Sequence, residues 1–300
     1  DRNFIRNLFL RFNAPDIDER STLARFVLDI LTYCTVDISK FVLSLCYYEL
    51  SLYFSANRLP YVLMPSLSIL YNIFAKNVKT LHLYYKDFVE YILPVLTANH
   101  LVLCSEQMIN LIELFVKNGN NEITSKVLQA IIQHFPYNRT SKILMFLTML
   151  LKILPVVNQL VLQEFMDEIF EIISKCISFP HTKISDLSKC LWINDTIQVL
   201  LNQNRKRLFP VILGILLSPS CSECQSDVQL NIQEVLDRLK SFDANSFNQC
   251  CIKCKEKSNN CNQYSLSQWI QIAKAASAND NTIDLSTTLP QFYKEYQNVQ

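Results

Sequence analysis

The chain of 300 residues is half hydrophobic, has 18% charged residues and carries a formal net charge of +1. This balance excludes a disordered chain and gives no overall field that favours nucleic acid. Its only glycines are Gly119 and Gly214, and neither lies in a glycine-rich loop, so nucleotide-binding loops are excluded and tight β-hairpins are disfavoured. We therefore expect no cofactor.

Apolar residues recur at helical spacing along the whole chain. Spacings of i, i+3, i+4 and i+7 predict amphipathic helices, and no stretch alternates at period two. The residues that share a predicted helical face are Phe4, Leu8 and Phe12; Leu23, Phe26, Val27 and Ile30; Met108, Leu111, Ile112 and Phe115; and Phe165, Ile169, Phe170 and Ile173. The pattern predicts an all-α protein.

Apolar residues followed by proline divide the chain at fairly regular intervals. Because a residue before proline disfavours the helical region, each pair predicts a helix end or a turn. With separations of 34, 42, 44 and 30 residues, the pairs are Leu59-Pro60, Leu93-Pro94, Phe135-Pro136, Phe179-Pro180 and Phe209-Pro210. Pro155 is expected to start or kink a second helix within one unit. The spacing favours a HEAT-like superhelical solenoid of about five to seven helical repeats, with an irregular helical domain as the alternative.

The composition changes after about residue 256. Residues 257–290 are rich in Asn, Ser and Thr, apart from an apolar patch that predicts one more helix, at Leu266, Trp269, Ile270 and Ile272. From Asn279 onward the pattern is typical of a loosely held tail. We predict a solenoid over residues 1–256 and a divergent, partly flexible C-terminal helix and tail over 257–300. The start at Asp1, without methionine or signal peptide, indicates a fragment.

The eleven cysteines are unevenly spread, and some lie within apolar helical runs, where a thiol packs as a small hydrophobe. They indicate a reducing compartment, so we expect a cytoplasmic protein, with a nuclear pool as a further expectation. The longest charge-free apolar run, residues 59–75, contains Pro60, Pro65 and Asn72. It is shorter than the roughly 20 apolar residues of a membrane span, so no membrane insertion is expected.

Several short motifs stand out, most of them in the middle of the chain. They are KILMFLTMLLKIL at Lys142–Leu154 after Phe135-Pro136, SKCISFPH at Ser174–His181, WIND at Trp192–Asp195, FPVI at Phe209–Ile212 and, at the start, Phe4, Leu8, Phe12, Asp16, Glu19, Arg20 and Leu23. From about residue 3 to residue 217 these segments resemble the B′ family of protein phosphatase 2A regulatory subunits. That family has a K-x-x-M-F-L helix, an S/A-K-C-V/I-S-x-x-H segment, a Trp-Asn-Asn-Glu stretch and an I-L-P-I-M helix.

The resemblance implies a non-catalytic solenoid that bridges the phosphatase scaffold and catalytic subunits and recruits substrate proteins. The residues it offers for partner binding are Lys175, His181, Trp192, Asn194 and Asp195. Each also has a purely structural interpretation. Lys175 fits an exposed helix position, His181 a turn and Trp192 a core anchor, because tryptophan is enriched in both cores and interfaces. Asn194 and Asp195 could instead cap a helix. A general helical-repeat scaffold for assembly or transport, without phosphatase association, is the alternative function.

The chain departs from the family in the substrate groove. Family members bind Leu-x-x-Ile-x-Glu peptides through a lysine, a histidine, an arginine, a tyrosine and a second arginine. Ungapped matching over residues 20–73 places these on Ala24, Leu28, Asp29, Leu31 and Ser39. None keeps the family chemistry, and Asp29 reverses the charge. Since a charge-assisted pair contributes about 1.5–3 kcal/mol, we predict no detectable binding of that peptide class.

Two Cys-x-x-Cys pairs near the end form a possible zinc set of four thiolates, at Cys221, Cys224, Cys251 and Cys254. The 26 residues between the pairs exceed the usual spacing of roughly 15–20, so unconnected thiols are the favoured interpretation. His82, His100, His134 and His181 are spread widely, without a nucleophile elbow or H-E-x-x-H motif. We therefore expect no catalytic residues. The cluster Arg205–Arg207 lacks interleaved aromatic residues, which favours a solvated helix C-terminus over a nucleic-acid site.

Overall fold

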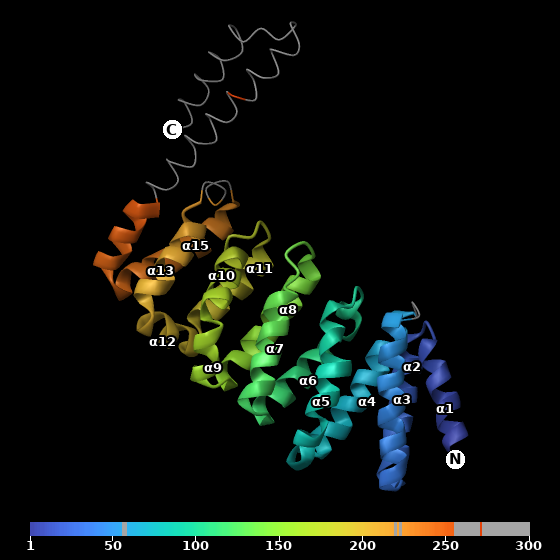
Figure 1. Ribbon diagram of the computed structural model, residues 1–300. Helices are drawn as coiled ribbons and strands as arrows, with labels where there is room; N and C mark the ends of the chain where they lie inside the picture. The colour runs from blue at the N-terminus through green and yellow to red at the C-terminus, as the bar shows by residue number, and fades with distance from the viewer. Residues whose placement is uncertain (56–58, 219–220, 222–223, 255–270, 272–300) are drawn as a thin grey trace, which may run out of the picture.

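The computed structural model describes residues 1–55, 59–218, 221, 224–254 and 271 of the chain. All regular structure within these ranges is helical, and they contain no strand. Figure 1 shows the helices stacked one after another into a curved array. The predicted all-α, HEAT-like solenoid is therefore confirmed.

The array has two layers, and in each layer every element contacts the next. The first layer consists of α2 (Ile17–Tyr33), α4 (Leu63–Lys76), α6 (Ser105–Asn118), α8 (Thr140–Ile153), α11 (Thr182–Ile193) and α15 (Ser226–Phe242). The second consists of α1 (Arg2–Leu10), α3 (Val36–Ser55), a run of short helices, α7 (Asn121–Gln133), α10 (Met166–Ile177) and α13 (Arg205–Leu216). Helices of the two layers alternate along the chain, as expected for two-helix repeats.

Repeat length can be measured from the starts of the first-layer helices. From α4 onward these helices begin at residues 63, 105, 140, 182 and 226, which lie 35 to 44 residues apart. HEAT-type repeats have roughly 40–47 residues, so most of the units match that class and one is short. The six first-layer helices of the described ranges agree with the expected five to seven repeats.

Short helical segments complete the layers and connect them. The run that replaces a long second-layer helix comprises η3 (Val78–Tyr84), α5 (Tyr85–Asp87), η4 (Phe88–Ile92), η5 (Leu93–Thr97) and η6 (Leu101–Cys104). The connecting segments are η1 (Arg11–Asn13), η2 (Pro60–Val62), η7 (Leu154–Val156), α9 (Gln159–Glu164) and α12 (Asp195–Gln203).

A continuous apolar core runs between the two layers. The predicted face of Met108, Leu111, Ile112 and Phe115 is fully buried, and the ring of Phe115 stacks on Phe88 with centroids 4.0 Å apart. The predicted face of α1 is wrong in part, because Phe4 is 49% exposed while Ile5 and Phe9 are buried. Phe4 instead meets Phe26 edge to face at 6.3 Å, so aromatic spacing alone misplaced the buried stripe by one residue.

The proline prediction is right at three of its five positions. Pro60 begins η2, and the chain turns at Phe135-Pro136 and at Phe179-Pro180. At Pro94 the chain stays helical and changes from a π-helical to a 3₁₀ segment, and the break comes only at Ala98.

Pro210 lies inside α13, against prediction. An interior proline destabilises a helix by about 3 kcal/mol, but the buried side chains of Phe209, Ile212 and Leu213 hold this helix in place. The prediction for Pro155 is confirmed: α8 ends at Ile153, and Pro155 lies in the first turn of the 3₁₀ helix η7 that begins directly after it.

Polar contacts between repeats join residues 39 to 47 positions apart. They pair Tyr53 with His100, Arg139 with Asn99, Lys152 with Glu113, Arg207 with Asp167, and Lys189 with Glu234. Each is at least partly exposed and stabilises the fold by about 0–1 kcal/mol. These contacts therefore connect several pairs of neighbouring repeats at similar offsets in the sequence.

No helix in the described part of the chain is long and apolar enough to cross a membrane. The apolar run at residues 59–75 instead forms η2 and most of α4, whose buried residues include Leu67 and Leu70. The helix predicted around Trp269 and the tail from Asn279 lie outside the described residues. The proposed boundary between the solenoid and this C-terminal region therefore stays a prediction.

Candidate functional site

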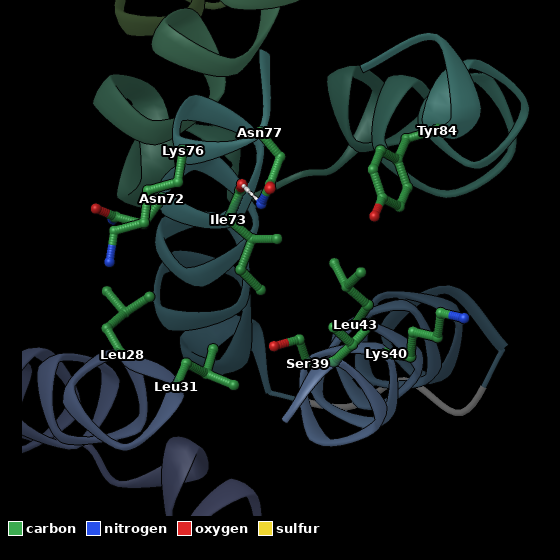
Figure 2. A pocket seen from close by; sticks show the side chains of 11 residues that line it. Leu28, Leu31, Ser39, Lys40, Leu43, Asn72, Ile73, Lys76, Asn77 and Tyr84 are labelled. Atoms are coloured by element: carbon green, nitrogen blue, oxygen red, sulfur yellow. Dashed lines mark hydrogen bonds between the residues drawn. The ribbon is translucent and has the colours of Figure 1, made fainter. Parts of the chain in front are cut away.

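A cavity of about 200 Å³ lies between α2, α3, α4 and η3. Figure 2 shows its lining: Leu28 and Leu31 come from α2, side chains of α3 and α4 face them, and Tyr84 lies on the far side. The complete lining comprises Leu28, Leu31, Val36, Ser39, Lys40, Leu43, Asn72, Ile73, Lys76, Asn77 and Tyr84. Four elements that are separate in sequence thus converge on one pocket.

The lining combines apolar and polar chemistry. Leu43 and Ile73 are buried, and Leu28 and Leu31 are half-buried, so these four provide apolar surface. At the edge of the cavity, the side-chain amide of Asn77 donates to the carbonyl of Ile73 at 2.8 Å (Figure 2), so α4 holds this amide in place. Such a pocket suits an apolar side chain with a polar or charged neighbour.

Two cations line the same cavity, Lys40 from α3 and Lys76 from α4. Both are exposed, and no ion pair joins either of them to a described carboxylate. Lys76 lies in the last turn of α4, where a cation is favoured by the helix dipole. The matching of groove residues in the sequence did not identify Lys40 or Lys76.

Of the five positions predicted to form a degenerate peptide groove, three line the cavity and two do not. Leu28, Leu31 and Ser39 line the cavity together. Ala24 is only 3% exposed and belongs to the core, and Asp29 is exposed but does not line the cavity. The lining residues Lys40, Lys76 and Tyr84 were missed, because only tertiary packing brings α3, α4 and η3 together.

The predicted partner-binding residues do not form one patch. His181 precedes α11 and Asn194 follows it, and the 12 residues of that helix span roughly 18 Å. Trp192 is 4% exposed and packs against Phe170 with ring centroids 5.6 Å apart, so the structure places it in the core. Its indole N–H is buried without a hydrogen-bond acceptor among the described residues.

The other four of these residues have local roles. Asn194 caps α12 by accepting from the backbone N–H of Thr196 at 3.0 Å, and Asp195 is exposed in the first turn. At the opposite end, Lys175 pairs with Glu171 at 2.6 Å and lies 5.2 Å from the Tyr137 ring centre. His181 precedes α11 and its carbonyl accepts backbone N–H groups of that helix. Their binding to a partner protein stays a prediction.

The four cysteines considered for zinc do not assemble into a metal site. No group of three or more His, Cys, Asp or Glu side chains in the described ranges could hold a metal ion. Cys221 is buried and its thiol donates to the carbonyl of Ile215 at 3.3 Å, while Cys224, Cys251 and Cys254 pack against the core as half-buried residues. Their contacts favour the interpretation as packing thiols.

The basic cluster Arg205–Arg207 lies at the start of α13, so its assignment to a helix C-terminus was wrong. Cations are disfavoured there by the helix dipole. Two carboxylates offset this: Arg207 donates twice to Asp167, at 2.9 and 2.6 Å, and Arg205 lies 3.9 Å from Asp243. The cluster therefore fastens neighbouring repeats together.

Comparison with known proteins identifies a family. The model of the family described as "Protein phosphatase 2A regulatory B subunit (B56 family)" matches residues 1–276. This range begins with α1 and includes every helix of the solenoid described above.

Individual relatives are more distant and longer. The chain is 25% identical to the B′ theta isoform of the 57 kDa phosphatase 2A regulatory subunit of Arabidopsis thaliana over 168 residues, covering 55% of the chain and 33% of the relative. It is 26% identical to the delta 2 isoform of the 56 kDa regulatory subunit of Schizosaccharomyces pombe, covering 94% and 45%. The human alpha isoform is 24% identical, covering 62% and 37%. The chain thus matches less than half the length of each of these relatives.

Proposed function

Since this chain belongs to the B56 family of protein phosphatase 2A regulatory B subunits, we propose that it is a non-catalytic subunit of a phosphatase 2A holoenzyme. In this role it binds the scaffold and catalytic subunits and directs the choice of substrate proteins. The observation that carries the proposal is the family match over residues 1–276, a range that contains the whole two-layer solenoid from α1 to α15. Nucleic acid and membrane insertion have no part in this role.

The architecture supports a binding role. A solenoid is stabilised by contacts between neighbouring repeats, and it presents long surfaces to several partners at once. Here the inner side chains of the central helices are buried, whereas Lys175, Asn194 and Asp195 remain accessible at the two ends of the α10–α11 unit. We assign these three accessible residues, rather than Trp192, to contacts with the other subunits.

Co-purification tests the proposal. The full chain, the scaffold subunit and the catalytic subunit are mixed and separated by size-exclusion chromatography, and we expect one ternary peak. Asp195→Lys should weaken the complex, because it reverses an exposed charge at the proposed contact. Asp29→Lys on α2 is the matched control, also exposed and separated from α11 by the helices α4, α6 and α8 of the first layer. Separate elution of the unmodified chain would reject the proposal and leave the general helical-repeat scaffold as the remaining function.

Substrate recruitment in this chain differs from that of its relatives. The cavity between α2, α3 and α4 keeps apolar walls, but Leu28 and Leu31 occupy positions where the family has histidine and tyrosine. We therefore propose that this chain selects other protein segments than the Leu-x-x-Ile-x-Glu class. Fluorescence titration with such a peptide checks this, and micromolar affinity for the unmodified chain would contradict it.

We also propose a cytoplasmic location with a nuclear pool. The support is chemical: burial raises the pKa of the thiols of Cys104 and Cys176 to about 12, so both stay protonated and pack as apolar groups. Thiols used in this way are typical of a reducing compartment. Imaging of a fluorescent fusion, checked by fractionation, should find the protein in cytoplasm and nucleus, and a secretory location would contradict the proposal.

A further inference from the structure

Two short connecting helices expose aliphatic side chains along one edge of the central repeats. Helix α9 connects α8 to α10, and α12 connects α11 to α13. Figure 1 draws α9 and α12 next to each other, and η7, which directly precedes α9, contacts α12. Leu160 is 68% exposed here, and Val156, Ile193 and Val199 are 41–44% exposed. We call these four residues the connector edge.

Each connecting helix already buries the apolar residues that hold it in place. Helix α9 buries Val161 and Leu162, and α12 buries Ile197, Leu200 and Leu201. The connector edge is therefore additional apolar surface, on the sides of these helices that do not pack into the core. Single exposed apolar residues are common, but four of them gathered on one edge indicate a binding surface.

Carboxylates flank the connector edge. Glu164 follows Leu160 by four residues on α9. Asp195 precedes Val199 by four residues on α12. Residues four apart share a helical face, so each of these aliphatic side chains has a carboxylate beside it. Glu168, in the first turn of α10, is a third exposed carboxylate, and none of the three pairs with a cation of the described residues.

Glu164 is the least compensated of these three charges. It is the last residue of α9, and a carboxylate is disfavoured at the negative end of a helix dipole. Asp195 and Glu168 lie in the first turns of their helices, where the dipole favours a negative charge. A cation brought by a partner is therefore stabilised most strongly at Glu164.

The cations closest in sequence leave the connector edge negative. Arg205 and Arg207 each pair with a carboxylate, and Lys152 at the end of α8 pairs with Glu113. Lys206 forms no ion pair within the described part of the chain, but it follows the far end of α12. The nine residues of α12 span roughly 13 Å, so Lys206 is remote from the acidic start of that helix.

An aliphatic surface with a negative border fits one kind of partner. A basic amphipathic helix carries apolar side chains at i, i+3, i+4 and i+7 and places Lys or Arg beside them, so it complements both features. Nucleic acid and the surface of an anionic membrane carry the same sign of charge as the border and are disfavoured. These charges favour a protein segment as the occupant.

We infer that the connector edge binds a basic amphipathic helix of a protein partner. The apolar face of that helix packs on Leu160 and the other aliphatic side chains, and its cations pair with Glu164 and Asp195. The cavity between α2, α3 and α4 belongs to other repeats, so this edge is a second, separate surface for recruitment. The role of the partner as a substrate rests on the proposed function, whereas the binding surface rests on α9 and α12 alone.

Binding is measured with a synthetic helical peptide made of leucine and lysine. Its leucines recur at i, i+3, i+4 and i+7, and the fluorescence anisotropy of the labelled peptide is followed as the full chain is added. We expect saturable binding that weakens at high salt, and slower hydrogen–deuterium exchange in α9 and α12 when the peptide is bound. Slower exchange confined to other helices would overturn the inference.

Leu160→Ser tests the apolar contact. We expect the peptide to bind about tenfold more weakly, or by about 1.4 kcal/mol, at an unchanged melting temperature because this side chain lies outside the core. Leu230→Ser on α15 is the matched control, since Leu230 is 63% exposed. An unchanged affinity of Leu160→Ser, or an equal loss in the control, would overturn the inference.

Glu164→Lys tests the negative border. The variant should bind the peptide about tenfold more weakly and with a smaller salt dependence, because one charge pair is lost and replaced by repulsion. Asp237→Lys, at an exposed position of α15, makes the same change in net charge away from the edge. Equal losses in both variants would show an effect of net charge alone and reject the site, as would full affinity of Glu164→Lys.

Two altered peptides and a vesicle test the class of partner. A peptide with glutamate in place of lysine and a peptide with serine in place of leucine should both fail to bind. Vesicles of phosphatidylcholine and phosphatidylserine should fail to bind as well. Binding of either altered peptide, or of the vesicles, would reject a basic amphipathic helix as the occupant.

The inference and the proposed function can fail separately. Leu160 and Glu164 are not among the residues assigned to contacts with the phosphatase subunits. A chain that binds the peptide but does not join those subunits would refute the proposed function only. A chain that joins them but does not bind the peptide would refute this inference only.

Discussion

The first repeats and the central repeats of this solenoid use their surfaces in opposite ways. Helix α2 buries only three of its 17 residues, and its leucines are half-buried beside the cavity. Helix α8 buries eight of its 14 residues, and Phe146 and Leu150 have no exposure. Helix α8 therefore serves mainly the core, whereas α2 leaves most of its side chains available for binding.

The largest expected effect is on stability, in the central repeats. Phe170 is fully buried and contacts Trp192, so Phe170→Ala should lower the free energy of unfolding by about 3–5 kcal/mol. Leu31→Ala, at the half-buried wall of the cavity, should lower it by less than about 1 kcal/mol, because little apolar surface is lost. Urea denaturation of both variants measures the difference, and equal losses would erase the contrast between the regions.

A second prediction concerns recognition in the first repeats. Leu28→His combined with Ser39→Arg restores two family-type side chains at positions that line the cavity, and each pair to a peptide carboxylate adds about 1.5–3 kcal/mol. We expect the double variant to gain micromolar affinity for a Leu-x-x-Ile-x-Glu peptide in a fluorescence titration. Thr32→Arg, exposed on the same helix, is the control that adds charge away from the cavity. Equal binding by the control would show that net charge alone is responsible.

A smaller effect is expected where central repeats are fastened together. Arg207 and Asp167 form a two-bond pair that is partly exposed, with 60% and 34% of the side chains accessible. Arg207→Met should therefore destabilise the fold by at most about 1 kcal/mol and more strongly at low salt. Thermal unfolding at two ionic strengths measures this, and a larger loss that ignores salt would point to packing instead.

The smallest effect is a pH dependence at the end of the array. Asp243 accepts from the backbone N–H of Ser246 at 3.0 Å, and hydrogen bonds to Ser246 hold the pKa of this carboxyl below its usual range. A depressed pKa means that the stabilisation is present above the usual pKa and is lost as the pH falls through the lower folded value. The protection factors of the amides of residues 244–254, corrected for the intrinsic exchange rate at each pH, should therefore fall in acid, and Asp243→Ala should abolish that pH dependence.

The sequence predicts the fold better than the site, for physical reasons. Helical periodicity and proline spacing are local signals, so they predicted the solenoid and its repeat length. They failed at Pro210, where packing of Phe209 and Ile212 outweighs the backbone preference. The cavity depends on tertiary neighbours: Leu28 and Leu31 were found through the family resemblance, but Lys40, Lys76 and Tyr84 come from other elements.

Sequence patterns also fail to predict which polar residues are buried. Arg20, one of the residues of the opening motif, is 6% exposed and donates to the carbonyls of Ala14 and Pro15, both at 2.7 Å. Nothing in its local sequence distinguishes such a clamp from a surface arginine.

The central claim is that this chain is a regulatory subunit of phosphatase 2A, and competition for the enzyme tests it most directly. A fixed amount of the human alpha isoform is bound to the scaffold–catalytic pair, and increasing amounts of the full chain are added. We expect saturable displacement of the alpha isoform, because both proteins would occupy the same surface. Retention of the alpha isoform at a large excess of the chain would contradict the claim.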